Sequence, residues 1–366
     1  MPLDEKQAEL ESISVILNNK KVNFSVKVIA SDLSFPWSVA ELPDNSLLVT
    51  EKTGKLKHLK NDGSVSTIKG LPSLYVKSQG GLLDLVLHPN FSENQTLFIS
   101  YAHGSDEANT TRLMSAKLAN DTLVDEKVLF EVEPYKDTPV HFGGRIAVLP
   151  DNMLVMTTGD GFDYREQAQR LDSLLGKSVR LTFDGRIPQD NPFTNQASAR
   201  SEIWSYGHRN PQGLVYDPLT SQLWMHEHGP AGGDEINIIS AGANYGWPVI
   251  TQGKDYSGAL ITPFKEYEGM QQPKVNWTPS IAPSGMDIYR SSSVPELEGA
   301  LLIGALVDRC IYIVFPEKSF EQIKLLESFN YRIRDILIRK NGNILVLTDS
   351  QQGKLLELTP KAESNE

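Results

Sequence analysis

The chain has 366 residues, of which 40% are hydrophobic and 22% charged, and its formal net charge is −11. This composition is that of a globular protein with a sizeable core, and the acidic balance excludes nonspecific binding to nucleic acid or anionic membranes, which needs a basic face. No apolar run reaches the roughly 20 residues that span a bilayer, so no integral membrane segment is expected, and the single cysteine, Cys310, excludes an internal disulfide.

The N-terminus, MPLDEKQAELESISV, is polar and acidic, and we interpret residues 1–22 as an N-terminal extension whose candidate element is a short helix. They lack the basic and then apolar segments of a secretory signal. The chain is therefore either cytoplasmic or a mature form with an added Met1, and composition does not choose between the two. Residues 361–366 are expected to form a polar tail.

Residues 23–360 contain six segments in which a polar turn leads into an apolar strand. They are PDNSLLVTE from Pro43, ENQTLFISY from Glu93, PDNMLVMTT from Pro150, LTSQLWMHE from Leu219, LEGALLIGA from Leu297 and KNGNILVLT from Lys340. Their spacing is typical of propeller blades, with longer gaps for inserted loops. We therefore predict one all-β domain, a six-bladed β-propeller of four-stranded antiparallel blades; a β-sandwich or a two-domain all-β protein is the alternative.

Two further elements are predicted from local pattern. A strand near Val26–Ile29 would close the ring against the last blade and leave no open edge. The segment EQAQRLDSLLGKSVRL, residues 166–181, is the best helical candidate in a chain where helical periodicity is scarce.

Loops from several blades meet near the central channel of a propeller, so motifs far apart in sequence can converge there. His141 opens HFGGR, and a histidine near its ordinary pKa suits a general base at neutral pH. Asp160, in TTGDGF, is placed to orient that imidazole. The alternatives are a hydrogen-bonded structural histidine and an ordinary turn.

Arginines are the candidates for an anion site. Alternation in YRIRD places Arg332 and Arg334 on one face of an extended segment, and Arg209 lies in GHRNP. Two adjacent arginines repel unless an anion lies between them. That anion is either Asp335 or Glu327 of the chain itself, or a polycarboxylate ligand.

The Gly-rich turn GPAGGDEIN offers carbonyl and carboxylate oxygens to a hard cation such as Ca²⁺. It lacks the spacing of an EF-hand, and no zinc, P-loop, dinucleotide-binding or GxSxG motif is present in the sequence.

Taken together, these loops resemble the soluble quinoprotein glucose and aldose sugar dehydrogenases, six-bladed propellers that bind pyrroloquinoline quinone (PQQ) and Ca²⁺. The resemblance runs from about Pro36 to Leu358 and is carried, in the family's order, by QGGLLDLVLHPNF, HFGGR, GHRNPQGL, HGPAGGDEIN, NYGWP, WTPSIAPSG and YRIRD. The short loops are more similar to the aldose sugar dehydrogenase branch than to the dimeric glucose dehydrogenase branch.

The resemblance implies a role for each matching residue. His141 would be the general base for the sugar's anomeric hydroxyl, oriented by Asp160, with Gln79 close to substrate and cofactor. The cofactor would be bound by residues of three motifs: Arg209, Asn210, Arg332, Arg334, Ser280 and, with Thr278 as a further candidate, Trp277.

The resemblance also implies two Ca²⁺ sites. The carbonyl oxygens of Gly229 and Pro230 would bind the ion that chelates PQQ. A second, structural ion would use the carbonyl oxygens of Thr251 and Gly253 together with Asp255.

The sequence departs from the family pattern at two places. The family usually has a lysine near PQQ after GAL, whereas this chain has Val307 and Asp308, with Arg309 as a candidate substitute. A family glutamine after the GD motif has no single match, because Gln167 and Gln169 compete and Arg165 occupies the ungapped position.

The resemblance implies oxidation of aldose sugars to lactones, with electrons passed to a quinone or a redox protein, in a mature periplasmic protein. Two alternatives stay open. One is a noncatalytic Ca²⁺-binding propeller that binds a partner. The other is a Ca²⁺-dependent lactonase or esterase, whose metal site would consist of several side-chain carboxylates and amides.

Overall fold

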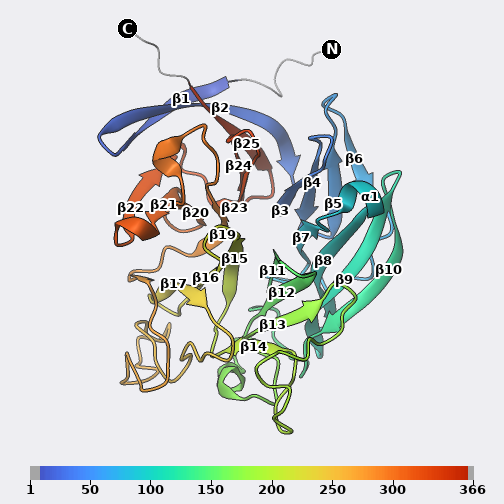
Figure 1. Ribbon diagram of the computed structural model, residues 1–366, viewed down its shortest axis with the longest axis vertical. Coiled ribbons are helices and arrows are strands. Elements are labelled where there is room, and N and C mark those ends of the chain that lie inside the picture. Colours follow the sequence, from blue (N-terminus) through green and yellow to red (C-terminus); the bar gives the residue numbers. More distant parts are fainter. Residues whose placement is uncertain (1–8, 362–366) are drawn as a thin grey trace.

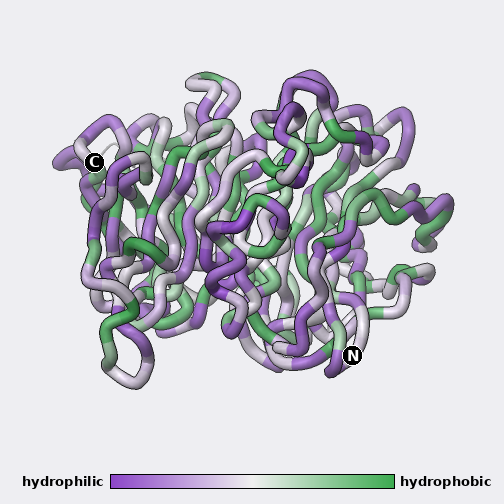
Figure 2. Tube along the Cα trace, turned by 90° about the horizontal axis from the view of Figure 1, so that it is seen from below, coloured by the Kyte–Doolittle hydropathy of each residue, from purple (hydrophilic) through white to green (hydrophobic). Residues whose placement is uncertain are grey.

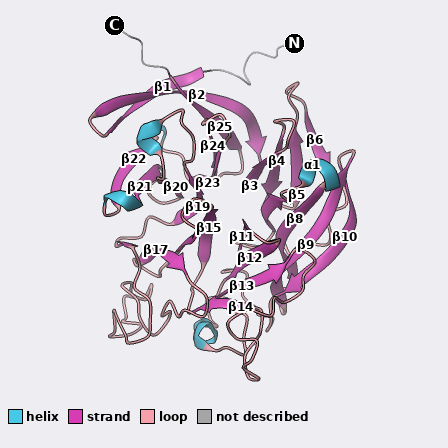
Figure 3. Cartoon of the chain, viewed as in Figure 1, coloured by secondary structure: helices cyan, strands magenta, loops and turns pink. Residues whose placement is uncertain are grey.

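The computed structural model describes residues 9–361. Nearly all of its regular secondary structure consists of strands, which form six antiparallel sheets around a central axis (Figures 1 and 3). The first blade contains β3 (Pro36–Glu41), β4 (Leu47–Glu51), β5 (Lys55–Leu59) and β6 (Val65–Ile68). The second contains β7 (Leu82–Leu87), β8 (Thr96–Gly104), β9 (Asn109–Ala119) and β10 (Thr122–Glu131). The third contains β11 (Gly143–Leu149), β12 (Met153–Thr158), β13 (Lys177–Thr182) and β14 (Ile203–Tyr206).

The remaining three blades continue the same order from the axis outward. The fourth contains β15 (Pro211–Asp217), β16 (Gln222–Glu227), β17 (Asp234–Ile239) and β18 (Val275–Trp277). The fifth contains β19 (Pro283–Ile288), β20 (Leu301–Ala305), β21 (Ile311–Phe315) and β22 (Glu321–Leu325). The sixth contains β23 (Ile333–Ile338), β24 (Ile344–Thr348), β25 (Gly353–Pro360), β2 (Lys20–Leu33) and β1 (Glu9–Leu17). The predicted fold class is confirmed.

Helices are few and short. They are α1 (Phe91–Asn94) and the 3-10 helices η1 (Arg165–Gln169), η2 (Pro295–Leu297), η3 (Pro316–Lys318) and η4 (Glu327–Phe329). Within residues 9–361, none of these helices has the length and apolar character needed to cross a membrane.

Each of the six repeated sequence segments forms the second strand of its blade, namely β4, β8, β12, β16, β20 and β24. These strands are buried on both faces because each blade packs against its two neighbours. Every residue of β4, β20 and β24 is buried. That burial explains why the segments read as nearly continuous apolar runs instead of alternating patterns.

The hydrophobic core lies between adjacent blades. In one cluster, Leu48 and Leu56 of the first blade pack with Leu97 and Ile99 of the second. Figure 2 shows hydrophobic stretches along the strands and hydrophilic ones in many of the loops. The six interfaces between blades therefore bury apolar surface all round the ring.

The ring closes in the sixth blade as predicted. β2 pairs with β25, with Val26 opposite Leu358 and Val28 opposite Leu356. An N-terminal strand thereby joins the last blade, so that the two ends of the propeller are held by a continuous ladder of backbone hydrogen bonds.

The N-terminal segment corrects one expectation. Where a short helix was the candidate, residues 9–17 form strand β1, which pairs with β2 through a turn at Asn18 and Asn19, both with positive φ. Val15 and Leu17 are buried and Ile16 is exposed, which is the period-two pattern of a strand. Residues 1–8 and 362–366, and the parts of the N-terminal extension and C-terminal tail that they include, lie outside the described residues.

The helical candidate at residues 166–181 is also corrected. Only η1 is helical there, and Lys177–Thr182 form β13 instead, paired on both sides with β12 and β14. The buried ammonium of Lys177 donates to the carbonyl oxygens of Gln167, Ala168 and Leu175. Sheet pairing and this buried amine outweigh the helical periodicity of the segment.

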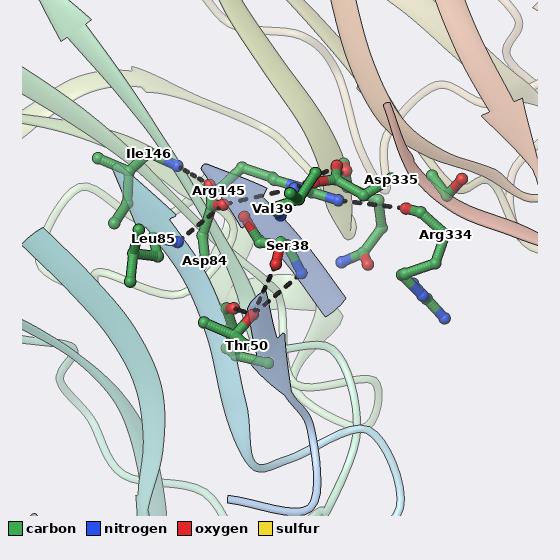
Figure 4. A network of polar contacts seen from close by, with 12 residues as sticks. Ser38, Val39, Thr50, Asp84, Leu85, Arg145, Ile146, Arg334 and Asp335 are labelled. Carbon is green, nitrogen blue, oxygen red and sulfur yellow. Dashed lines mark hydrogen bonds and ion pairs between the residues drawn. The ribbon is translucent and has the colours of Figure 1, made fainter. Parts of the chain in front are cut away.

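A network of buried charges joins the inner strands at the centre of the ring (Figure 4). Arg145 of β11 contacts Asp335 of β23 at 2.9 Å and Asp84 of β7 at 3.5 Å, and its guanidinium lies 4.0 Å from the ring centre of Trp37. Asp84 also accepts a hydrogen bond from the backbone of Ile146, and Asp335 accepts one from that of Val39. We call Asp84, Arg145 and Asp335 the central network; it fills the middle of the channel with satisfied polar groups.

Candidate active site

A cavity of about 400 Å³ opens where the inner strands begin, at the end of the channel next to the central network. All six blades contribute to its wall, through Trp37, Gln79, Gly143, Asn210, Val307 and Arg334. A volume in this range suits a small-molecule ligand. Of the residues predicted for the site, Gln79, Asn210, Arg332 and Arg334 line this cavity.

His141 and Asp160 form the predicted pair. The imidazole Nδ1 lies 2.7 Å from Asp160 Oδ1, and both side chains are buried. Asp160 Oδ1 also accepts from the backbone N–H of Phe162, and Oδ2 accepts from the indole N–H of Trp247 at 2.7 Å. Since all of its neighbours donate to this carboxylate, His141 donates from Nδ1, and Nε2 is left as the basic nitrogen.

The environment keeps His141 neutral. Burial lowers the pKa of the imidazole below its usual value, the carboxylate of Asp160 opposes this shift, and the charges of Arg209 and Lys136 add to it. A neutral imidazole at neutral pH accepts a proton, so this pair has the protonation state of a general base.

Gln79 positions the loop that carries His141. Its Oε1 accepts a hydrogen bond of 2.8 Å from the backbone N–H of His141, which has a positive φ of 53°. A left-handed conformation is unfavourable for a histidine unless the surrounding contacts hold it. Gln79 therefore fixes the backbone of the loop while its side chain lines the cavity.

Arg332 and Arg334 share a face, as alternation predicted, and both contact the carboxylate of Asp349, at 2.9 and 3.2 Å. The counter-ions expected from sequence are corrected. Asp335 instead pairs with Arg145, and Glu327 lies 3.6 Å from Lys324. Lys52 lines the same cavity, so three cations and one carboxylate contribute to its lining. We call Lys52, Arg332, Arg334 and Asp349 the cation cluster.

The pKa shifts in the cation cluster follow from burial and crowding. Burial lowers the pKa of Arg334, and burial followed by repulsion from Arg334 lowers that of Lys52. Although burial opposes ionisation of Asp349, the charges of Arg334 and Arg332 hold its pKa below the usual value. Burial is therefore the main cause of the lowered pKa values of Arg334 and Lys52, and the neighbouring cations lower the pKa of Lys52 further.

Arg209 lies between two cavities. Its Nη1 donates to the carbonyl oxygens of Gly229 at 2.6 Å and His228 at 3.1 Å, and its guanidinium lies 5.3 Å from the ring centre of Trp247. It lines a second cavity of about 250 Å³, whereas its neighbour Asn210 lines the first. Arg209 therefore marks the boundary between the two cavities.

The two loops predicted to bind Ca²⁺ touch each other. Ala231 and Lys254 exchange backbone hydrogen bonds of 2.9 and 3.1 Å, and a Cβ at Gly253 would lie 2.3 Å from the carbonyl oxygen of Gly232. Gly229 is equally close to its neighbours, since a Cβ there would lie 2.3 Å from that same oxygen. These close approaches gather main-chain oxygens, which are ligands suited to a hard cation.

The individual Ca²⁺ candidates are placed as follows. The carbonyl oxygen of Gly229 accepts from Arg209, and Pro230 lines the second cavity. Thr251 accepts from the backbone of Gly253 through its hydroxyl, and Asp255 accepts from the backbone and hydroxyl of Ser257. No cluster of three or more His, Cys, Asp or Glu side chains that could hold a metal occurs within residues 9–361. Main-chain oxygens would therefore supply most ligands of a cation bound here.

Two predicted cofactor residues lie elsewhere. Trp277 is buried in β18, where its indole N–H donates to Gln322 at 2.8 Å and its ring packs on Tyr312, so it lines neither cavity. Its apolar ring is more stable in the interface between blades. Ser280 donates its hydroxyl to the buried carboxylate of Asp234, which also accepts from the backbone N–H of Gly229. Ser280 thus supports the loop of Gly229.

The structure also shows where the residues lie at which the sequence departs from the family pattern. Val307 is 56% exposed at the cavity wall, Asp308 contacts Tyr312 and Lys324, and Arg309 contacts Asn330. Neither charged neighbour lines the cavity.

Three residues compete for the position of the family glutamine, and the structure places them differently. The side chain of Gln169 donates to Asn244 and to the carbonyl oxygen of Trp247. The backbone carbonyl oxygen of Gln167 accepts a hydrogen bond from the ammonium of Lys177. Arg165 is the one of the three that lines the second cavity.

Sequence reasoning missed three residues of the site, namely Lys52, Trp247 and Asp349. A signal for two of them exists in the repeats. Lys52 directly follows β4 and Asp349 directly follows β24, and Asp160 lies two positions after β12. Alignment of the six repeats by their strand ends would have placed these side chains at one face of the propeller.

Comparison with known proteins places the chain in a family. Residues 33–357 match the family described as Glucose / Sorbosone dehydrogenase. Aldose sugar dehydrogenase YliI of Escherichia coli is 40% identical over 346 residues, which covers 92% of this chain and 93% of that protein.

Two solved structures show the same architecture. The apo-form of the soluble aldose sugar dehydrogenase from Escherichia coli has a TM-score of 0.89 and 39% identity, over 92% of this chain and all of that one. The PQQ-bound form of the aldose sugar dehydrogenase from Streptomyces coelicolor has a TM-score of 0.75 and 25% identity, over 97% of this chain and 100% of that one. The family model covers most of the chain and the Escherichia coli relative is 40% identical over nearly its full length, so this chain belongs to the glucose/sorbosone dehydrogenase family.

Proposed function

We propose that the protein is a PQQ- and Ca²⁺-dependent dehydrogenase that oxidises aldose sugars at C1 to lactones. The observation that carries the proposal is the buried His141–Asp160 pair, of which His141 directly precedes Phe142 and Gly143 in the lining of a cavity with surplus positive charge. PQQ is a quinone with several carboxylates, so the cation cluster fits its anionic edge. A bound PQQ would supply the hydride acceptor for C1, and a bound Ca²⁺ would supply a Lewis acid next to the quinone.

The proton is handled by the protein. His141 accepts the proton of the anomeric hydroxyl at Nε2, and Asp160 stabilises the imidazolium that forms. Gln79 keeps the loop of His141 in its strained conformation. Because Asp160 is itself held by Trp247 and the backbone of Phe162, the base keeps one orientation.

Cofactor binding is assigned to residues of the first cavity and to Arg209, which lines the second. Arg332 and Arg334 pair with carboxylates, Asn210 donates from the cavity wall, and Arg209 stabilises the negative charge that develops on reduction. Ser280 acts through Asp234 on the loop of Gly229.

The cation is assigned to the carbonyl oxygens of Gly229 and Pro230. The carbonyl oxygens of His228 and Gly229 converge on the cationic Nη1 of Arg209, which indicates a site that favours positive charge. A bound Ca²⁺ and this guanidinium would compete for Gly229. A second ion is assigned to Thr251, Gly253 and Asp255, on the loop that pairs with the first.

The sugar is assigned to the second cavity. Phe162 lies 5.2 Å from the ring of His141 and is stacked near Tyr256, and both aromatic rings are more than one-third exposed. Aromatic faces beside a general base suit the apolar face of a sugar ring. We assign the electron acceptor to a quinone or a redox protein, and the protein to the periplasm, by analogy with the family.

The test is reconstitution. Purified protein is treated with chelator, supplied with PQQ and Ca²⁺ separately and together, and assayed for dye reduction with a panel of aldoses. We expect sugar-dependent reduction that needs both additions. PQQ binding without turnover would favour the noncatalytic propeller, and lactone hydrolysis without PQQ would favour the lactonase.

A further inference from the structure

The cation cluster holds more positive charge than its partners neutralise. Arg332, Arg334 and Lys52 line one wall of the cavity, and Asp349 is the carboxylate that joins the two arginines. Three positive charges and one negative charge leave a surplus of two, in a protein whose formal net charge is −11. Such a local surplus is unfavourable without an anion, so this wall is built for a ligand with at least two negative charges.

The fifth blade supplies no cation to this wall. Val307 faces the cavity with an apolar side chain. Asp308 is held by Tyr312 and Lys324. Arg309 reaches Asn330 at 3.3 Å and does not line the cavity. None of these three residues therefore brings a positive charge to the cavity.

The first blade supplies a lysine instead. Lys52 follows β4, which is the repeat of the strand β20 that precedes Val307. Its Nζ donates 2.8 Å to the carbonyl oxygen of Ser78 and lies 5.0 Å from the ring centre of Phe35. An ammonium has three N–H donors, so the bond to Ser78 leaves two for a ligand in the cavity.

We propose that Lys52 is a cofactor-binding residue that supplies, from the first blade, the cationic contact that Val307 does not make from the fifth. This inference rests on the proposed function, because the ligand is the anionic edge of PQQ. The contact is an ammonium to a carboxylate or quinone oxygen, next to the two arginines.

A purely structural role for Lys52 predicts different behaviour. In that case the bond to Ser78 serves only to hold the segment before Gln79, and with it the loop of His141. Removal of the amine would then loosen this loop in the absence of cofactor. A new cation at Val307 on the fifth blade would not restore what was lost.

The experiment is calorimetric titration of the Ca²⁺-loaded protein with PQQ, so that binding is read without turnover. Lys52→Met should raise the dissociation constant for PQQ by roughly ten- to a hundredfold, because this is the loss of affinity typical of removing a hydrogen bond to a charged group. Lys52→Arg should retain most of the affinity. Lys55→Met is the matched control, because Lys55 is exposed, begins β5 directly after the turn of Lys52 and does not line the cavity.

The double variant Lys52→Met with Val307→Lys decides between the two roles. We expect it to recover most of the lost affinity and the salt dependence of binding, with a melting temperature of the PQQ-free protein unchanged across the set. Wild-type affinity in Lys52→Met, or no recovery in the double variant, would overturn the inference and leave the dehydrogenase proposal standing. Absence of PQQ binding in the wild-type protein would overturn both.

Discussion

Arg334 and Asp335 are adjacent in β23, yet they belong to two regions with opposite charge balance. Asp335 lies in the central network, where Arg145 is shared by two carboxylates. Arg334 lies in the cation cluster, where it shares the carboxylate of Asp349 with Arg332 and where Lys52 lines the same cavity. Alternation along one strand sends the two side chains to different surroundings.

The two regions also differ in how completely their polar groups are satisfied. In the central network Arg145 donates to the carbonyl oxygen of Gln212, and the carboxylates of Asp84 and Asp335 each accept backbone N–H groups. Such a closed set holds blades together. The cation cluster keeps a positive surplus, which costs stability and is useful only when an anionic ligand binds. We therefore expect substitutions in the network to affect folding, and those in the cavity to affect binding and turnover.

The largest effect is expected at the cavity. His141→Ala should lower kcat by roughly a hundred- to ten-thousandfold, because the proton of the anomeric hydroxyl loses its acceptor. PQQ binding and the melting temperature should stay as in the wild-type protein. Single-turnover dye reduction measures the loss of rate, and calorimetry measures PQQ binding. Unchanged turnover would remove His141 as the base.

Arg145→Met should have the largest effect on folding. Removing the shared cation leaves two buried carboxylates without it, which costs about 3–5 kcal/mol of unfolding free energy. Denaturant unfolding gives the value. Arg180→Met is the matched control, since Arg180 also lies over a tryptophan, at 4.8 Å from Trp204, but pairs with the exposed Asp190. A loss no larger than the control's would mean that the network does not hold the blades together.

Arg332→Met tests whether the cation cluster serves ligand binding and not folding. It should weaken PQQ binding by roughly tenfold or more, while the unfolding free energy changes by less than about 1 kcal/mol, because the lost pair with Asp349 is partly exposed and one repulsion is relieved. Arg309→Met, outside the cavity, should change neither. If Arg332→Met destabilised the protein as much as Arg145→Met, the contrast between the two regions would fail.

The smallest effect is a pH shift. Burial lowers the pKa of His141, so activity is present above that pKa and is lost as pH falls through it, which puts the acid limb of kcat/KM below pH 6.5. Lys136 lies 3.6 Å from the ring centre of Phe142, and its charge contributes to the shift. Lys136→Met should raise the pKa of His141 and move the limb to higher pH by less than about one unit. A limb that stays in place, or moves to lower pH, would contradict this.

The six repeated segments made the fold predictable from the sequence. Each repeated segment is a second strand buried on both faces, and such strands carry the strongest apolar signal. Strand β1 was not predicted because its pattern, with Val15 and Leu17 inward, is compatible with a short helix until β2 is present to pair with it. Residues 166–181 were misread for the same reason, since pairing with β12 and β14 is a nonlocal contact.

The site was predictable where a residue lies in a distinctive motif. His141, Asp160, Gln79, Arg332 and Arg334 come together as expected, although their roles stay predictions. Trp277 shares such a motif but lies between blades, because motif membership does not specify which way a ring points.

The sequence by itself determined the number of blades, the closing strand and the residue types that chemistry requires, since these depend on local pattern and repetition. Only the tertiary structure decided which charges neutralise each other. Asp349 instead of Asp335 joins the two arginines, and Lys52 approaches them from the other side of the ring closure. The physical reason is that strand ends far apart in the chain meet at the axis, where a difference of one residue selects the cavity or the central network.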